Sequence, residues 1–282
     1  DTRLHHYLNM YMALQKSSNI YMGRMIQRVI EHLGEDWYRN CLRDIFGFGK
    51  KTGIELSSES VGLLPSPNKK HPNGTLEWSK PTPFSISFGH NILVTSIQML
   101  KAYSMIANGG YEVQPTLIRK IVKTNRDGTL EVLLDNEEKR NKEQRSPLLS
   151  PSSLKEVVKG MMYVTKPGGA APKADIFGYT EVGKTATSEK VIGGTYSKKD
   201  HVATFIGFCP AIQPKFVLVI VIDEPEYKTI PGVGKNQYGG NCAAPAFCEI
   251  GKKTLQYLGV EPDDPFGFPP GDPRRDPSKA IW

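Results

Sequence analysis

The sequence predicts an α+β fold in which helices pack on an antiparallel sheet. Residues 179–187, 201–208 and 216–222 are rich in β-branched and aromatic side chains, and short turns separate them. Consecutive strands on short connections are expected to be antiparallel neighbours. Other stretches repeat apolar residues at helical spacing. With 39% hydrophobic residues among 282, the chain can bury a sizeable core.

The first two predicted helices have clear start and stop signals. Apolar residues recur at helical spacing from Met22 to Leu33, and Gly34 is expected to end this helix, which we expect to be buried. Thr95 and Gln98 form a capping-box pattern at the start of a second helix, which the glycines at 109 and 110 should end.

Proline positions predict the start of two more helices. Ser150 and Pro151 open one with an apolar face that includes Leu154 and Met161, and Pro245 starts the last helix, which runs to residue 258. Between these elements, residues 112–150 predict a hairpin with a turn at 126–128, followed by a mobile loop. The proline-rich residues 261–282 predict an extended or disordered tail.

Charge and cysteine usage narrow the class of protein. The formal net charge of +7 favours an anionic partner, but no dense Lys/Arg run is present, so nucleic acid is not indicated. The longest apolar run, residues 216–222, is far shorter than the ~20 residues of a membrane span. No signal peptide is recognised, and a start at Asp1 indicates a processed or cut-out segment. The four cysteines lack metal-ligand spacing; a Cys242–Cys248 disulfide stays open for an oxidising compartment.

Two short motifs carry the chemistry that this sequence predicts. They are Ser-Ser-Asn at residues 17–19 and Gly-Lys-Thr-Ala-Thr at residues 183–187. Penicillin-binding proteins and serine β-lactamases use an S-x-x-K serine, an S-x-N loop and a Lys-Thr-Gly strand. The two motifs match the second and third of these signatures in order, and no S-x-x-K string precedes them. The sequence therefore resembles the second part of such a catalytic domain.

Further segments extend the resemblance to the transpeptidase domain of class B, monofunctional penicillin-binding proteins. The segment at residues 84–89 is similar to that of the cell-division type of these proteins. The resemblance implies a penicillin-binding-protein/serine β-lactamase-like fold, with residues 1–260 as the C-terminal portion of the transpeptidase domain. The supporting segments are residues 46–59, 87–90, 94–98, 107–110 and 238–245.

The resemblance implies a role for each motif residue. Ser17 would pass a proton between a general-base lysine and the leaving amine, and Asn19 would hold the peptide carbonyl of the substrate. Lys184 would place a positive charge beside the developing oxyanion and the substrate carboxylate, to which Thr185 and Thr187 would donate hydroxyl groups. Plain helix N-capping is the alternative for Ser17 and Asn19.

Ala186 departs from the family pattern, which has glycine there. A methyl group that points at the cleft would crowd a substrate lying along the strand edge. The resemblance therefore implies a substrate-binding position at Ala186 with altered substrate range and β-lactam fit.

The implied activity is that of a peptidoglycan D,D-transpeptidase. Its substrates would be peptide stems ending in D-Ala-D-Ala, cleaved through an acyl-serine that β-lactams also acylate. No cofactor and no metal are implied. The nucleophile would lie in an upstream half of the domain outside this chain, at the periplasmic face of the bacterial inner membrane, with cell-division proteins as further partners. This chain alone would be inactive; the alternative is a non-catalytic binding or scaffold module of the same fold.

Several strings imitate other sites. Gly178, Gly183, Lys184 and Thr185 fit the P-loop pattern of an ATPase, but the flanks favour a strand instead of the required strand, loop and helix. Residues 51–53 are a literal Lys-Thr-Gly without paired strands after it. The S-x-x-K strings at 66–69 and 152–155 lie among prolines and in the first turn of a predicted helix, so neither is expected to act as the nucleophile.

Overall fold

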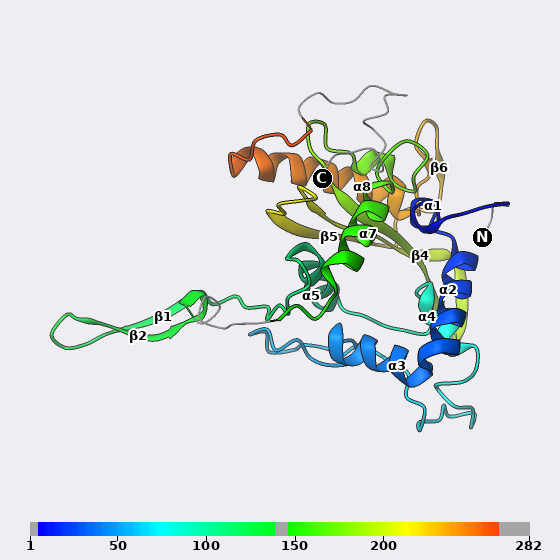
Figure 1. Ribbon diagram of the computed structural model, residues 1–282, viewed down its shortest axis with the longest axis horizontal. Helices are drawn as coiled ribbons and strands as arrows, with labels where there is room; N and C mark the ends of the chain where they lie inside the picture. The colour runs from blue at the N-terminus through cyan, green and yellow to red at the C-terminus, as the bar shows by residue number, and fades with distance from the viewer. Residues whose placement is uncertain (1–4, 139–145, 265–282) are drawn as a thin grey trace.

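The computed structural model describes residues 5–138 and 146–264 (Figure 1). The helices are α1 (Met10–Lys16), α2 (Asn19–Leu33), α3 (Glu35–Asn40), the π-helix η1 (Cys41–Ile45), α4 (Thr82–Ser87), α5 (Ser96–Ala107), α7 (Pro151–Met162), the 3-10 turn η2 (Pro172–Ala174) and α8 (Gly239–Tyr257). The strands are β1 (Lys120–Thr124), β2 (Leu130–Asp135), β3 (Val182–Ile192), β4 (Thr195–Cys209), β5 (Phe216–Asp223), β6 (Thr229–Ile230) and β7 (Gly234–Lys235).

The three predicted strands form one antiparallel sheet in the order β3-β4-β5. Lys184 of β3 lies opposite Ile206 of β4, and Thr185 lies opposite Phe205. The predicted α+β class is therefore confirmed. The first strand begins at Val182 instead of residue 179, because Tyr179 is held in a turn by its N–H bond to the carbonyl of Ile176, at 2.9 Å.

Helices cover both faces of this sheet (Figure 1). On one face, Phe247 of α8 packs edge-on against Phe205, with ring centroids 4.7 Å apart. On the other face, Met161 of α7 and Tyr103 of α5 form a core with Phe208 of β4. The alternation of side chains along β4 sends Phe205 and Phe208 to opposite layers. The same alternation in β3 decides which side chains face the site.

Local capping signals predicted the helix starts well, with one exception. The capping box of Thr95 and Gln98 is present, and α7 begins at Pro151. The prediction that the last helix starts at Pro245 is wrong, because α8 already begins at Gly239 and contains Pro245. A Cβ on Gly239 would lie 2.3 Å from the carbonyl oxygen of Thr204. Close packing of this glycine on the sheet thus extends the helix beyond the start that local signals indicate.

The prediction that the helix after Asn19 is buried is also wrong. Within the part of the chain that the structure describes, only Ile26 of α2 is buried. Its apolar residues Ile20, Met25 and Leu33 are 57%, 42% and 52% exposed. The helical period was predicted correctly, but periodicity does not show whether another element covers the apolar face.

The hairpin that the sequence predicts within residues 112–150 is present. β1 and β2 form the predicted hairpin, which projects from the body (Figure 1), and Gly128 turns it with a φ of 84°. Part of the predicted loop after the hairpin, and the predicted tail beyond residue 264, lie outside the described residues. After α8 the chain returns to the segment just before β3, where Asp263 accepts a hydrogen bond of 2.7 Å from the N–H of Thr180.

Two properties of the whole fold bear on its setting. All four cysteines are free, so the Cys242–Cys248 alternative is not realised in this structure. Among the described residues, no helix combines the length and the apolar character that crossing a bilayer requires.

Candidate active site

Ser17 occupies a kink between two helices. It follows the last residue of α1 and has a φ of 56°, in the left-handed region that a non-glycine residue adopts at a cost. Ser18 then caps α2, because its hydroxyl accepts the N–H of Tyr21 at 3.2 Å. The N-cap residue of α2 is therefore Ser18, and neither Ser17 nor Asn19 has that role. Asn19 is the first residue of the helix. The kink leaves the Ser17 side chain exposed at the mouth of a pocket.

Lys184 reaches Ser17 from the third position of β3. Its ammonium donates to Ser17 Oγ at 2.7 Å and to the carbonyl oxygen of Thr185 at 3.2 Å. Burial lowers the pKa of Lys184 to about 8. The residue before it is a glycine because a Cβ at Gly183 would lie 2.2 Å from the ring of Phe205. The lysine thus donates a hydrogen bond to a serine hydroxyl and loses its proton at a lower pH than an ordinary lysine does.

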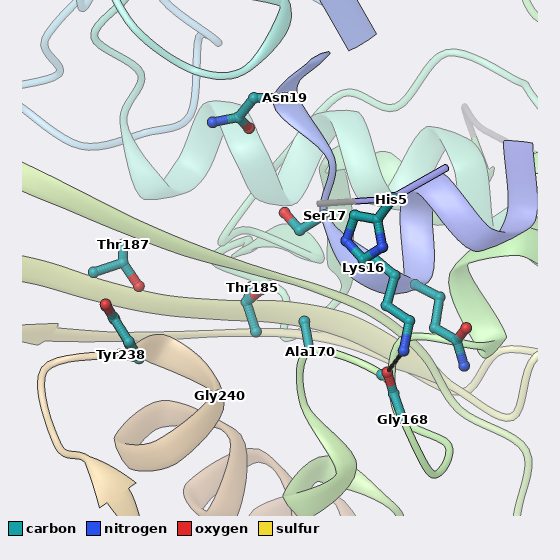
Figure 2. A pocket seen from close by; sticks show the side chains of 12 residues that line it. His5, Lys16, Ser17, Asn19, Gly168, Ala170, Thr185, Thr187, Tyr238 and Gly240 are labelled. Carbon is teal, nitrogen blue, oxygen red and sulfur yellow. Dashed lines mark hydrogen bonds between the residues drawn. The ribbon is translucent and has the colours of Figure 1, made fainter. Parts of the chain in front are cut away.

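Thr185 and Thr187 point to the other side of β3, as the strand alternation requires. Both line a pocket with a volume of about 490 Å³, a size that suits a small ligand. Thr187 Oγ1 accepts the N–H of Gly239 at 3.1 Å, so its own hydroxyl proton remains to be donated. Figure 2 shows Ser17 and Asn19 on one side of the strand and Tyr238 and Gly240 on the other. The pocket is lined by His5, Gln15, Lys16, Ser17, Asn19, Gly168, Gly169, Ala170, Thr185, Thr187, Tyr238 and Gly240.

Positive charge gathers at this pocket. Lys16 lies in its wall and Lys184 lies behind Ser17. The N-terminus of the 19-residue helix α8 adds the partial positive charge of its backbone N–H groups at Gly240. The hydroxyl groups of Thr185 and Thr187 supply hydrogen-bond donors. This combination favours a carboxylate over a neutral ligand.

The structure brings together five of the six predicted site residues. Ser17, Asn19, Thr185 and Thr187 line the pocket, and Lys184 contacts Ser17. Ala186 is exposed and is not among the lining residues, so its part in substrate binding stays a prediction.

Sequence reasoning missed the rest of the wall. The glycine-rich stretch at residues 168–170 and the Tyr-Gly-Gly at 238–240 were signals that small residues allow close approach. A Cβ on Gly240 would lie 2.1 Å from the carbonyl oxygen of Ala170, so these two segments pack tightly at the pocket. No sequence signal pointed to Gln15 and Lys16, which reach the pocket only because α1 ends there.

Two of the strings that imitate other sites do not have the structure that those sites require. The N–H groups of Thr52 and Gly53 donate to the carboxylate of Glu59 at 2.6 and 3.0 Å, so the literal Lys-Thr-Gly forms a loop and no sheet edge. The P-loop alternative fails because Lys184 and Thr185 lie inside a strand, where no helix N-terminus begins.

Neither S-x-x-K string reaches the pocket. Lys69 pairs with Glu77 at 2.8 Å, and its string forms a turn. Ser152 contacts the hydroxyl of Ser150 at 2.8 Å in the first turn of α7. Neither Ser66 nor Ser152 lines the pocket that holds Ser17.

The chain that carries this arrangement of serine, lysine and threonines has relatives among known proteins. The family described as penicillin-binding protein transpeptidase domain matches residues 1–252. The chain belongs to this family. The confirmed resemblance includes the class B type, and two of the relatives named FtsI support the lean toward cell division.

Individual relatives cover most of this chain. It is 31% identical over 236 residues to stage V sporulation protein D of Bacillus subtilis, covering 82% of this chain and 32% of the relative. It is 31% identical over 264 residues to the peptidoglycan D,D-transpeptidase FtsI of Buchnera aphidicola, covering 93% of this chain and 40% of the relative. The chain therefore spans less than half the length of these curated relatives.

A solved structure shows the same family fold. Penicillin-binding protein 3 of Mycobacterium tuberculosis, complexed with ampicillin, is 28% identical and superposes with a TM-score of 0.71. The match covers 95% of this chain and 54% of that chain.

Proposed function

We propose that this chain is part of a peptidoglycan D,D-transpeptidase and supplies its proton relay and carboxylate-binding groups. The observation that carries the proposal is the 2.7 Å hydrogen bond from Lys184 Nζ to Ser17 Oγ at the edge of a pocket lined by Thr185 and Thr187. The names of the relatives and the ampicillin complex of a similar structure support it. The acylated serine belongs to protein sequence outside this chain, since neither S-x-x-K string lies at the pocket.

The relay follows from the direction of the hydrogen bond. Because Lys184 donates to Ser17 Oγ, the hydroxyl proton of Ser17 is free to point into the pocket toward a leaving amine. As the C–N bond of the substrate breaks, Ser17 gives this proton to the amine nitrogen. The proton that the attacking serine loses to its general-base lysine then replaces it on Ser17. Lys184, whose pKa of about 8 keeps most of it charged near neutral pH, holds Ser17 Oγ by its hydrogen bond and supplies the positive charge. Asn19, which lines the pocket, holds the peptide carbonyl in this proposal.

The other side of β3 recognises the substrate terminus. The hydroxyl groups of Thr185 and Thr187 donate hydrogen bonds to a carboxylate. The N-terminal end of α8 and the ammonium group of Lys16 add electrostatic attraction. A peptide stem that ends in D-Ala-D-Ala presents such a carboxylate, and so does a β-lactam. The net charge of +7 agrees with an anionic polymer as partner.

The same proposal gives the setting of the protein. Peptidoglycan stems place the reaction at the periplasmic face of the inner membrane, and the division-type relatives point to cell-division proteins as partners. Residues 1–260 form the C-terminal portion of the transpeptidase domain, and residues 261–282 form its tail.

Acylation by a fluorescent penicillin tests the proposal in the full protein that contains this chain. Lys184→Ala removes a charge-assisted contact of about 1.5–3 kcal/mol, so acylation should slow by roughly 10- to 100-fold. Lys51→Ala is the matched control, since Lys51 heads the literal Lys-Thr-Gly, and it should acylate like the unmodified protein. Equal rates in the unmodified protein and Lys184→Ala would reject the assignment. Peptide mapping that finds the label on Ser66 or Ser152 would reject a nucleophile outside the chain.

A further inference from the structure

A buried group of charges lies beside the loop and the strand that carry the candidate site. The Glu181 side chain is 0% exposed and immediately precedes β3. Its carboxylate accepts hydrogen bonds from Thr165 Oγ1 at 2.5 Å, Lys166 Nζ at 2.9 Å and the N–H of Ile176 at 3.1 Å. Lys166 also donates to Asp175 at 2.6 Å. The assigned relay and carboxylate-binding roles use none of these groups.

The charges of this cluster depend on one another. Burial disfavours the ammonium of Lys166, but the carboxylates of Glu181 and Asp175 outweigh that effect and raise the Lys166 pKa. Burial raises the pKa of the Glu181 carboxyl, and the charge of Lys166 opposes the rise. A buried ion pair contributes little net stability compared with apolar side chains of similar size. Stability alone is therefore a weak reason for this pair.

Lys166 opens the loop that forms one wall of the pocket. Gly168, Gly169 and Ala170 of this loop line the pocket. The loop is held against the last turn of α1 by three hydrogen bonds. They run from the N–H of Ala170 to the carbonyl of Gln15 at 3.1 Å, from Gln15 Nε2 to the carbonyl of Pro167 at 3.4 Å, and from Lys16 Nζ to the carbonyl of Gly168 at 2.7 Å.

These contacts form a closed series that includes Ser17 and Lys184. Lys184 stands three residues after Glu181, about 10 Å along an extended strand. Glu181 holds Lys166, the loop after Lys166 holds α1, and Ser17 directly follows α1. The hydrogen bond between Ser17 and Lys184 completes the series. The Lys166–Glu181 pair is one link of this series, between the start of β3 and the loop that contacts α1.

We infer that Lys166 and Glu181 are positioning residues that set the distance between Ser17 and Lys184. This inference rests on the proposed function. Neither side chain lines the pocket, so both act through the loop and the strand that they join. Loss of the pair lets the loop at residues 167–170 and the end of α1 shift relative to β3. A misplacement of about 1 Å costs up to about 100-fold in rate.

The test separates positioning from stability by means of a double variant in the full protein. Lys166→Met leaves a buried carboxylate without its cation, so both the thermal midpoint and the acylation rate constant should fall. Lys166→Met/Glu181→Met replaces the whole pair by apolar side chains and should restore the thermal midpoint. Its acylation rate constant for penicillin should stay at least about 10-fold below that of the unmodified protein, with the affinity of the encounter complex little changed.

The control variant is Lys120→Met, which breaks the Lys120–Asp135 pair of the projecting β1–β2 hairpin, at 3.1 Å, and should leave acylation unchanged. A double variant that regains both the thermal midpoint and the unmodified acylation rate would overturn the positioning role. Lys184→Ala is measured in the same assay. If Lys184→Ala acylates normally, the proposed function fails; if it is slow while the double variant is fast, only the positioning role fails.

Discussion

The ammonium of Lys184 lies 2.7 Å from the hydroxyl oxygen of Ser17, although 167 residues separate them in the chain. Ser17 stands in the kink between α1 and α2, and Lys184 stands on β3, one of the two edge strands of the sheet. Both motifs that the sequence singled out therefore meet in one hydrogen bond. This contact joins a helical layer to the sheet at the mouth of the pocket.

Two replacements of Ser17 distinguish the effect of its hydroxyl group from the effect of its left-handed backbone conformation. Ser17→Ala removes the relay oxygen and keeps a side chain at a φ of 56°, whereas Ser17→Gly removes the oxygen and relieves the left-handed strain. Both variants should acylate slowly in the full protein, by about 10²- to 10⁴-fold for a lost proton-transfer group. Ser17→Gly should be the more stable of the two in thermal unfolding. Rapid acylation in either variant would show that the hydroxyl has no part in the relay.

The pH dependence of acylation should report the charge of Lys184. Burial lowers its pKa to about 8, so the ammonium is lost as the pH rises through 8. The advantage of the unmodified protein over Lys184→Met in acylation rate should therefore shrink between pH 7 and pH 9. Taking the ratio of the two rates removes the titration of other groups. A ratio that is constant across this range would contradict a role for the charge.

The lowered pKa of Lys184 also predicts how folding stability depends on pH. The contribution of Lys184 to stability should rise with pH, whereas its contribution to the acylation rate should fall. The folded state binds the Lys184 proton more weakly than the unfolded state, whose lysine has a pKa near 10.5. The unfolded state thus binds more protons between pH 8 and pH 10.5, and the contribution of Lys184 to stability rises with pH in this window. Chemical denaturation of the unmodified protein and Lys184→Met should show their difference in unfolding free energy changing with that sign. A difference that is flat from pH 8 to pH 10.5 would contradict the lowered pKa.

Thr187 should act through its hydroxyl proton. Its oxygen accepts the N–H of Gly239, and its own proton is available to a carboxylate in the pocket. Thr187→Val keeps the shape and removes the donor, and it should weaken acylation by roughly 10-fold, the value of a hydrogen bond to a charged group. Thr187→Ser keeps the donor and serves as the control. Equal losses in the two variants would point to packing of the methyl group instead.

Gly240 should tolerate no side chain. A Cβ there would lie 2.1 Å from the carbonyl oxygen of Ala170, which belongs to the pocket wall. Gly240→Ala must therefore push α8 and the loop apart, with a stability loss of about 1–3 kcal/mol for overpacking. Acylation should fall with it, because the shifted loop lines the pocket. Thermal unfolding and penicillin acylation of this variant check both effects, and a variant with unmodified values for both would contradict the close approach.

Much of the fold was predictable because its signals are local. The N-terminal side of α7 depends on Ser150 and Pro151, and the capping box of α5 depends on Thr95 and Gln98, all within one turn of the helix that they start. The order and direction of β3, β4 and β5 follow from short connections, which leave few alternatives to antiparallel neighbours.

The site residues that belong to short motifs were predictable from the sequence. The pocket residues that come from distant segments without a motif were not. Ser17, Asn19, Lys184, Thr185 and Thr187 were found from two motifs. Gln15 and the loop at residues 168–170 were not, because they belong to the pocket only through the packing of α1 on that loop. Likewise, α8 begins before Pro245 because Gly239 packs closely on the sheet and Gly240 packs closely on the loop at residues 168–170.

The sequence by itself singled out a serine, an amide and a lysine through two short motifs, and the resemblance to the family supplied the relay that we propose for them. Only the tertiary structure decided their geometry. The pKa of Lys184 depends on burial, and the exposure of α2 depends on what covers its apolar face. The pairing of Lys166 with Glu181 depends on a loop that folds back onto the start of β3. Burial and long-range contact are properties of the assembled chain, and the residue pattern of a single segment carries no record of them.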